Sequence, residues 1–209
     1  MFSNLGTSDL VTVLVTMLVS VSIHEAMHAF TAHALGDTTA KDEGRLTLNP
    51  LKHIDLFTTV LLPVFLIAIH LPPIFIAKPV PFDPSRVRFQ EFGAALVALA
   101  GPFTNLALAV LASLLIRFGS LDWGVGWLHA LALFMQINIA LFVFNMIPLP
   151  PLDGSRLLYA FAPEPVQRVM QQIEHAGFMI TIGIFLLISP VLLPVIGNIT
   201  DSIFTFLLR

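Results

Sequence analysis

The sequence predicts an all-α polytopic membrane protein with about four full transmembrane helices and a re-entrant hairpin that carries short β or extended segments. Of its 209 residues, 56% are hydrophobic and only 11% are charged, whereas soluble domains carry about a quarter charged residues. The apolar residues are gathered into runs of about 20, the length that crosses a bilayer as a helix. No polar stretch is long enough for a separate soluble module, so we expect residues 1–209 to form a single membrane-embedded domain.

The composition also limits the possible metal ligands and binding partners. The chain contains no cysteine, which excludes disulfides and thiolate metal sites and leaves histidine and carboxylate side chains as the strong metal ligands. Its formal charge of −3 is too small to indicate a nucleic-acid partner. The N-terminus has no basic n-region of a signal peptide, so we expect its apolar run to be retained as a span.

The first spans follow from apolar runs in chain order. Residues 10–34 are long and apolar enough to cross a bilayer, and they end before Gly36 and a polar loop. A shorter apolar segment at residues 56–75 is interrupted by prolines. Residues 92–116 and 125–147 are clear spans.

The last part of the chain predicts surface helices followed by a further span. Residues 152–175 are mixed in character and favour one or two amphipathic surface helices around residues 163–165. Residues 177–197 can span again. We expect Pro190 and Pro194 to perturb the far end of that helix.

The loop charges predict the orientation in the membrane. If the C-terminal ends of the first span and of the 125–147 span face the cytoplasm, residues 35–91 cross an even number of times, and 56–75 is a re-entrant hairpin. Only Arg117 and Arg209 then lie outside, as the positive-inside rule requires. A full crossing at 56–75 would move three further basic residues outside. The Lys and Arg residues on the inside are Lys41, Arg45, Lys52, Lys78, Arg86, Arg88, Arg156 and Arg168.

The stretch SIHEAMHAF, residues 22–30, places two histidines and a glutamate inside the first span. An ionisable group at bilayer depth costs at least about 2.5 kcal/mol, so it indicates function by default. His24 and His28 are four positions apart, which puts both imidazoles on one helix face, about 6 Å apart along the axis. Glu25 stands at the general-base position of H-E-x-x-H zinc proteases. The alternative is a polar helix face that lines the interior of the bundle.

A catalytic zinc ion needs a third protein ligand and one open position for water. The candidate is Asp153, in NMIPLPPLDGSR (residues 145–156), where prolines end a helix and Gly154 gives the backbone freedom. The alternative for Asp153 is an N-cap of the helix that follows. We therefore expect one Zn²⁺ per chain, held by His24, His28 and Asp153.

These motifs resemble those of the site-2 protease family of intramembrane zinc metalloproteases. The similar residues are the H-E-x-x-H at 24–28 and an N-x-x-P-x-x-x-L-D-G at 145–154. Two weaker family features are GRLTLNPLKHID after the first motif and AKPVPF before the 92–116 span. The resemblance covers residues 10 to 160. It implies that His24, His28 and Asp153 bind zinc, that Glu25 is the general base, and that Asn145 helps hold the substrate or the developing oxyanion.

The chain departs from the family pattern in two respects. Many members have Gly-Trp before the Lys-Pro motif, where this chain has Ile74, Phe75 and Ile76. Larger members carry a PDZ or CBS module and an extra span before the histidines, and we expect this chain to be a minimal form without them. Regulation through such modules is therefore not expected.

Three further polar features have two interpretations each. The Asn145 amide is a candidate donor to the oxyanion, or else a helix C-cap or a helix–helix hydrogen bond. AKPVPF, residues 77–82, is a candidate edge strand for an unwound substrate, or else a rigid loop that closes the hairpin. GPFTN, residues 101–105, indicates close helix packing, while the resemblance implies that Asn105 supports the site from behind the ligands.

The residues thus predict a metalloendopeptidase that hydrolyses a peptide bond within or near a transmembrane segment of another membrane protein. We expect it in the plasma membrane, in contact with the lipid bilayer, with its active site towards the cytoplasmic side. The alternative is an ion or proton transporter or channel that uses the intramembrane His, Glu and Asp cluster, although no repeated halves are detectable. A zinc-binding relative without proteolysis is disfavoured by the intact Glu25. The sequence identifies neither the substrate nor the oligomeric state.

Overall fold

The computed structural model describes residues 6–53, 61, 78, 80–119, 124–176 and 178–209, and across these residues it is helical, with no strand. Within these residues, four helices are long and apolar enough to cross a membrane, and they correspond to the four full spans predicted from the sequence. They are α1 (Thr7–Ala34), α4 (Gln90–Phe118), α5 (Val125–Asn145) and α8 (Phe178–Leu208).

The remaining elements are short and lie between the spans. α2 (Thr39–Asp42) and the 3₁₀ turn η2 (Pro50–Lys52) follow α1. α6 (Asp153–Phe161) and α7 (Glu164–His175) separate α5 from α8, which confirms the amphipathic helices predicted for this segment. α7 starts where it does because a proline stands in its first turn, a position that needs no intrahelical N–H bond.

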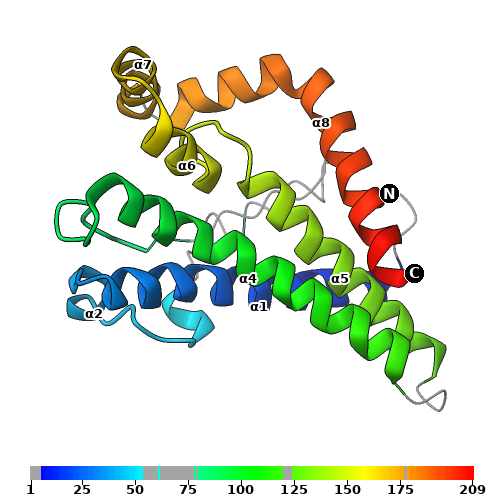
Figure 1. Cartoon of the computed structure of the whole chain (residues 1–209). Coiled ribbons are helices and arrows are strands. Elements are labelled where there is room, and N and C mark those ends of the chain that lie inside the picture. The colour runs from blue at the N-terminus through cyan, green and yellow to red at the C-terminus, as the bar shows by residue number, and fades with distance from the viewer. Residues whose placement is uncertain (1–5, 54–60, 62–77, 79, 120–123, 177) are drawn as a thin grey trace.

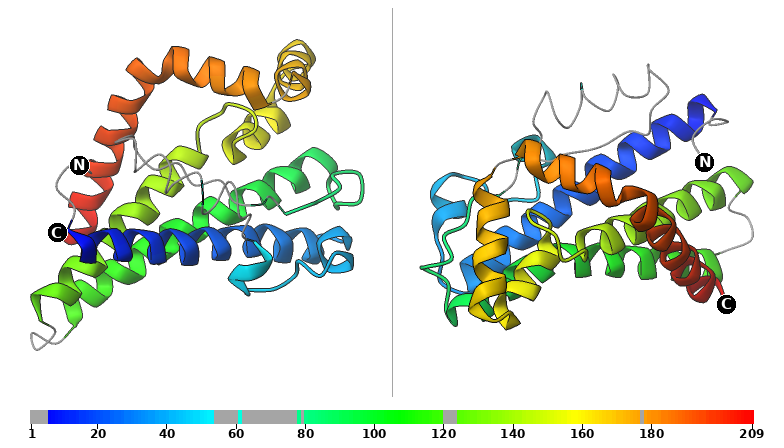
Figure 2. Two further views of the ribbon diagram at one scale, coloured as in Figure 1. Left: turned by 180° about the vertical axis from the view of Figure 1, so that it is seen from behind. Right: turned by 90° about the horizontal axis from the view of Figure 1, so that it is seen from above.

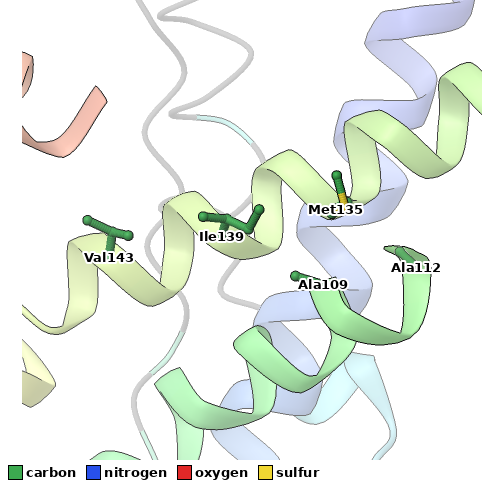
Figure 3. Close-up of a cluster of buried hydrophobic side chains, with 5 residues drawn as sticks. All are labelled: Ala109, Ala112, Met135, Ile139 and Val143. Carbon is green, nitrogen blue, oxygen red and sulfur yellow. The ribbon is translucent and has the colours of Figure 1, made fainter. Parts of the chain in front are cut away.

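α4 is the central helix of the bundle, because it packs against α1, α5, α6 and α8. Figure 1 and Figure 2 show α4 alongside both α1 and α5, the two helices against which it packs most extensively. The buried face of α4 consists mainly of alanine and glycine, and small residues allow helix backbones to approach closely in membranes. A core cluster joins α4 to α5 through Ala109, Ala112, Met135, Ile139 and Val143 (Figure 3).

The end of α1 and the start of α4 lie at the same end of the bundle. The backbone N–H of Arg88 donates to the carbonyl of Leu35 at 2.9 Å, and the N–H of Asp83 donates to Asp37 Oδ2 at 2.8 Å. The chain between them therefore returns to the face from which it left, as an even number of crossings requires. The predicted hairpin at 56–75 lies outside the described residues, apart from position 61.

Two expectations differ from the structure. The short β segments are not confirmed, because Lys78 and the described residues 80–83 form no strand. The last span was expected over 177–197, but α8 continues through Pro190 and Pro194 to Leu208. A proline removes one intrahelical hydrogen bond and bends a helix without necessarily ending it. The ribbon of α8 accordingly changes direction along its length in Figure 1.

Candidate metal centre

His24, His28 and Asp153 meet at one point, although 125 positions separate His28 from Asp153. The two Nε2 atoms are 3.0 Å apart, His24 Nε2 is 3.1 Å from Asp153 Oδ2, and His28 Nε2 is 3.4 Å from Asp153 Oδ1. Within the described part of the chain, this is the one group of three such side chains that could hold a metal ion. The three residues proposed from the sequence are thus brought together.

Local structure explains why the three side chains converge. The histidines lie one helical turn apart on α1, and Asp153 is the first residue of α6. The following Gly154 allows α6 to start tightly against the end of α5, because a Cβ there would lie 2.3 Å from the Met146 carbonyl oxygen. The N-cap residue of α6 is Leu152, and Asp153 is the first helical residue, so the alternative role of N-cap is not the one observed.

The outer nitrogens of both imidazoles are occupied by the protein. His28 Nδ1 lies 2.7 Å from the carbonyl oxygen of Val97, and His24 Nδ1 lies 2.6 Å from the amide oxygen of Asn105. Because both partners are acceptors, each Nδ1 carries the hydrogen, and each neutral ring presents a lone pair on Nε2. Two lone pairs that face each other at 3.0 Å repel, and a cation relieves that repulsion.

The donor set fits zinc in spacing and in chemistry. Tetrahedral zinc with ligands at about 2.0–2.1 Å separates those ligands by about 3.3 Å, and the three separations here are 3.0, 3.1 and 3.4 Å. Asp153 Oδ2 is buried without a hydrogen-bond partner, an arrangement that costs free energy in the absence of a cation. Two imidazoles and one carboxylate also form a common ligand set for catalytic zinc.

The charge of Asp153 suits this role. A carboxyl group has an ordinary pKa of about 3.9, and a divalent cation beside it favours the charged form further. The side chain is therefore an anion at neutral pH. It partly neutralises the charge that a divalent cation brings into the site.

Gly101 of α4 keeps the space beside the two histidines open. A Cβ at this position would lie 2.5 Å from His28 Nε2 and 2.6 Å from His24 Nε2, closer than van der Waals contact permits. Any side chain here would obstruct the access of an ion to both ligand atoms. The sequence had indicated only close helix packing at this glycine, and its position opposite the H-E-x-x-H motif was not foreseen.

Glu25 is held by a segment before α4. We call residues 78 and 80–83 the strap. The N–H of Val80 donates to Glu25 Oε2 at 2.9 Å, and the buried guanidinium of Arg45 donates to the carbonyl of Lys78 at 2.7 Å. Because proline has no N–H, Val80 has the single backbone donor among residues 79–81. That donor is used by Glu25, so it is not available for strand pairing with a substrate.

Asn145 occupies the last position of α5, and its side chain is engaged locally. Its amide nitrogen donates to the carbonyl of Leu141, one turn earlier, at 3.0 Å. This bond is neither the C-cap nor the helix–helix contact that the sequence allowed as alternatives. An amide NH₂ has two hydrogens, so one donor remains when Leu141 is bonded.

Asn105 and Asn138 are both fully buried. Asn105 contacts His24, as the resemblance implied for a residue behind the ligands. Asn138 of α5 accepts a hydrogen bond from Asn105 of α4 at 3.0 Å, so this contact joins two helices. The presence of two asparagines inside apolar runs indicated buried hydrogen-bonding residues, but the pattern did not predict the residue to which each is bonded.

Comparison with known proteins gives the family. Residues 116–190, which include Asp153, match the family described as Peptidase family M50. The chain is 36% identical over 198 residues to "Putative zinc metalloprotease YwhC" of Bacillus subtilis, with 90% of this chain and 87% of that protein covered. It is 34% identical over 181 residues to "Putative zinc metalloprotease Rip2" of Mycolicibacterium smegmatis, with 84% and 66% covered. No solved structure matches the chain.

These relationships confirm the resemblance that the two motifs indicated. YwhC is matched over most of its length at more than 30% identity, and the family match covers α5, α6 and α7. The chain therefore belongs to peptidase family M50, the site-2 protease family to which its motifs pointed.

Proposed function

We propose that this protein is an intramembrane protease that hydrolyses a peptide bond within or near a transmembrane segment of another membrane protein. Membership of the family makes the chain a zinc-dependent metalloendopeptidase. The observation that carries the finer proposal is the position of the ligand cluster. Its atoms lie within 4.8 Å of one another, and two of the three ligands belong to α1, a candidate membrane span.

His24, His28 and Asp153 are the proposed zinc ligands. A zinc ion held by them supplies Lewis-acid activation of water and of the peptide carbonyl. The protein fixes its ligands beforehand, because the Val97 carbonyl and the Asn105 amide orient the two imidazoles. Ligands that are held in place by such partners raise metal affinity by about 10- to 100-fold.

Glu25 is the proposed general base. It follows His24 directly, so its carboxylate lies beside the ligand face of α1 without being part of the ligand set. The Val80 N–H holds Oε2 and leaves Oε1 to accept the proton of the attacking water. Glu25 then passes this proton to the leaving amine.

Asn145 is proposed to donate to the substrate carbonyl or to the developing oxyanion. One amide hydrogen remains when the other is bonded to Leu141. One well-placed donor of this kind contributes about 3 kcal/mol to the stabilisation of the transition state. Because Asn145 ends α5, it lies at the start of the loop that leads to Asp153.

The proposed orientation places the active site towards the cytoplasmic side of the plasma membrane. The loop between α1 and α4 and the segment between α5 and α8 carry eight of the ten basic residues, and positive charge favours the cytoplasmic side. His24 lies ten positions before the end of α1, which corresponds to a depth of about 15 Å along the helix. The transporter alternative has no support from the comparisons, all of which point to peptidases.

The proposal is tested by mass spectrometry of native membranes. Chain termini that lie within or next to membrane spans should appear with the wild-type protein and be absent with Glu25→Gln, which keeps all three ligands. Glu43→Gln makes the same chemical change at an exposed position and should leave the termini unchanged. Cleavage confined to soluble domains, or equal cleavage by Glu25→Gln, would contradict the proposal.

A further inference from the structure

A chain of hydrogen bonds leads away from His24 into the bundle. His24 Nδ1 lies 2.6 Å from Asn105 Oδ1, and Asn105 Nδ2 lies 3.0 Å from Asn138 Oδ1. Asn138 Nδ2 then reaches Ser20 Oγ at 2.9 Å and the carbonyl oxygen of Phe134 at 2.9 Å. The two asparagines and Ser20 are each 0% exposed, so water does not compete for these bonds.

The direction of every bond in this chain is fixed at its far end. A backbone carbonyl only accepts, so the group of Asn138 that meets Phe134 is its NH₂, and its oxygen faces Asn105. That oxygen also only accepts, so Asn105 turns its NH₂ towards Asn138. Its own oxygen consequently faces His24, and the hydrogen of the imidazole lies on Nδ1.

We propose that Asn138 is a positioning residue that, through Asn105, fixes the tautomer of His24 and keeps the lone pair of Nε2 directed at the metal. The inference rests on the proposed zinc site. If Asn105 turned over, its NH₂ would face Nδ1 and favour the tautomer that carries hydrogen on Nε2. That tautomer has no lone pair on Nε2, so it cannot bind the proposed metal through this atom.

His28 offers an internal comparison. Its Nδ1 is bonded to the carbonyl of Val97, which cannot turn over and needs no further support. The side-chain amide that supports His24 has two possible orientations of nearly equal shape. The amide nitrogen of Asn105 also lies 3.5 Å from the carbonyl oxygen of Ser20, but the 3.0 Å bond to Asn138 is the shorter one. Asn138 is therefore the main group that orients this support of His24.

The first test uses zinc affinity, measured by competition with a chromophoric chelator in detergent micelles. Asn138→Leu keeps the branched shape of the side chain but removes both the acceptor and the donor, and should weaken zinc binding by about 10-fold, the lower end of the effect of residues behind metal ligands. Asn138→Asp can still accept from Asn105 but cannot donate to the Phe134 carbonyl. It should therefore retain zinc within about twofold while lowering the thermal unfolding midpoint.

A variant of Asn105 separates an effect on the His24 tautomer from a general disruption of the fold. A carboxylate only accepts, so Asn105→Asp presents oxygen to His24 whatever stands at position 138. In the Asn105→Asp background, Asn138→Leu should change zinc affinity by less than about twofold, and the two substitutions should not be additive. The spectrum of bound Co²⁺ should report the altered geometry at the metal in Asn138→Leu alone.

Ser113→Ala is the matched control, because it removes a buried 2.7 Å bond from α4 to the Leu207 carbonyl without touching the chain to His24. It should alter the unfolding midpoint and leave zinc affinity unchanged. Wild-type protein that binds no zinc would overturn both this inference and the proposed site. Zinc binding by wild type that is unchanged in Asn138→Leu, or lost equally in Asn138→Asp, would overturn the inference alone. Should Asn138→Leu fail to fold, Asn138→Ala carries the same expectation.

Discussion

The backbone N–H of Val80 donates a 2.9 Å hydrogen bond to Glu25, so the proposed general base is anchored by a residue 55 positions away. The strap that carries Val80 is itself held by Arg45, which donates to the Lys78 carbonyl. Lys78 also donates its N–H to the carbonyl of His53. The orientation of Glu25 thus depends on loop residues that are distant in sequence from the proposed metal ligands.

Arg45→Ala should lower both stability and activity. Arg45 is only 5% exposed, and the loss of one hydrogen bond from a charged donor costs about 1.5–3 kcal/mol. The thermal unfolding midpoint and the cleavage rate should fall together, and Arg45→Lys should restore part of both because an ammonium can also donate to the carbonyl. Lys41→Ala, at an exposed position nearby, is the control. An unfolding midpoint equal to that of wild type would contradict the structural role of Arg45.

Gly101→Ala should abolish zinc binding without unfolding the protein. The new methyl group would lie 2.5–2.6 Å from both Nε2 atoms, whereas alanine is otherwise favoured over glycine in a helix by about 1 kcal/mol. Zinc content should therefore fall to background while helicity by circular dichroism is kept. Gly197→Ala is the control, because a Cβ there has no neighbour within 4 Å. Stoichiometric zinc in Gly101→Ala would show that the ion sits elsewhere.

Asp153→Asn should weaken zinc binding more than a change behind the ligands does. The substitution removes the negative charge and replaces a carboxylate oxygen by an amide at nearly constant shape, so the affinity should drop by more than about 100-fold. The buried Oδ2 without a hydrogen-bond partner is the atom concerned. Asp201→Asn, an exposed carboxylate on α8, should bind zinc as wild type does. Chelator competition distinguishes the two outcomes.

Asp37 should make the stability of the folded protein depend on pH through the loop after α1. Burial acts to raise the pKa of Asp37, but hydrogen bonds from the Thr39 hydroxyl and from the N–H groups of Asp83 and Thr39 outweigh it and lower the pKa. A carboxyl whose pKa is lower in the folded than in the unfolded chain stabilises the protein above the unfolded pKa, about 3.9, and loses that contribution as the pH falls further.

Asp37→Asn should accordingly lower the unfolding midpoint at pH 7, and the gap to wild type should narrow as the pH falls below about 4. The expected loss at pH 7 is about 1–3 kcal/mol, because the N–H of Asp83 loses a charged acceptor. Asp42→Asn, at an exposed position of the same loop, should show no such gap. A gap of constant size from pH 7 to pH 3 would refute the role given to this carboxylate.

The candidate spans and the cluster of His24, His28 and Asp153 were predictable because each has a local or compositional signature. Runs of about 20 apolar residues specify spans, and two histidines four positions apart specify one helix face. Asp153 could be predicted as the third member because the sequence holds no cysteine and few acidic residues near a helix break. The continuation of α8 beyond its two prolines could not be predicted, because a proline weakens a helix by an amount that tertiary contacts can offset.

The contacts that orient the site could not be predicted from the sequence pattern. Val80 binds Glu25 through its backbone, and a backbone N–H is the same in nearly every residue type. The partner of Asn138 depends on how α4 and α5 pack, which no periodicity of either helix determines. Gly101 could be recognised as a small residue, but the neighbour that requires it to be small lies on α1.

The central place of α4 has a consequence for how the site tolerates change. α1 and α6, which carry the three proposed ligands, both pack against α4, and α4 also supplies the Val97 and Asn105 groups that hold the imidazoles. A displacement of α4 would therefore move both arms of the proposed metal site at once, so the small residues on its buried face control the geometry of the metal site as well as the packing of the bundle.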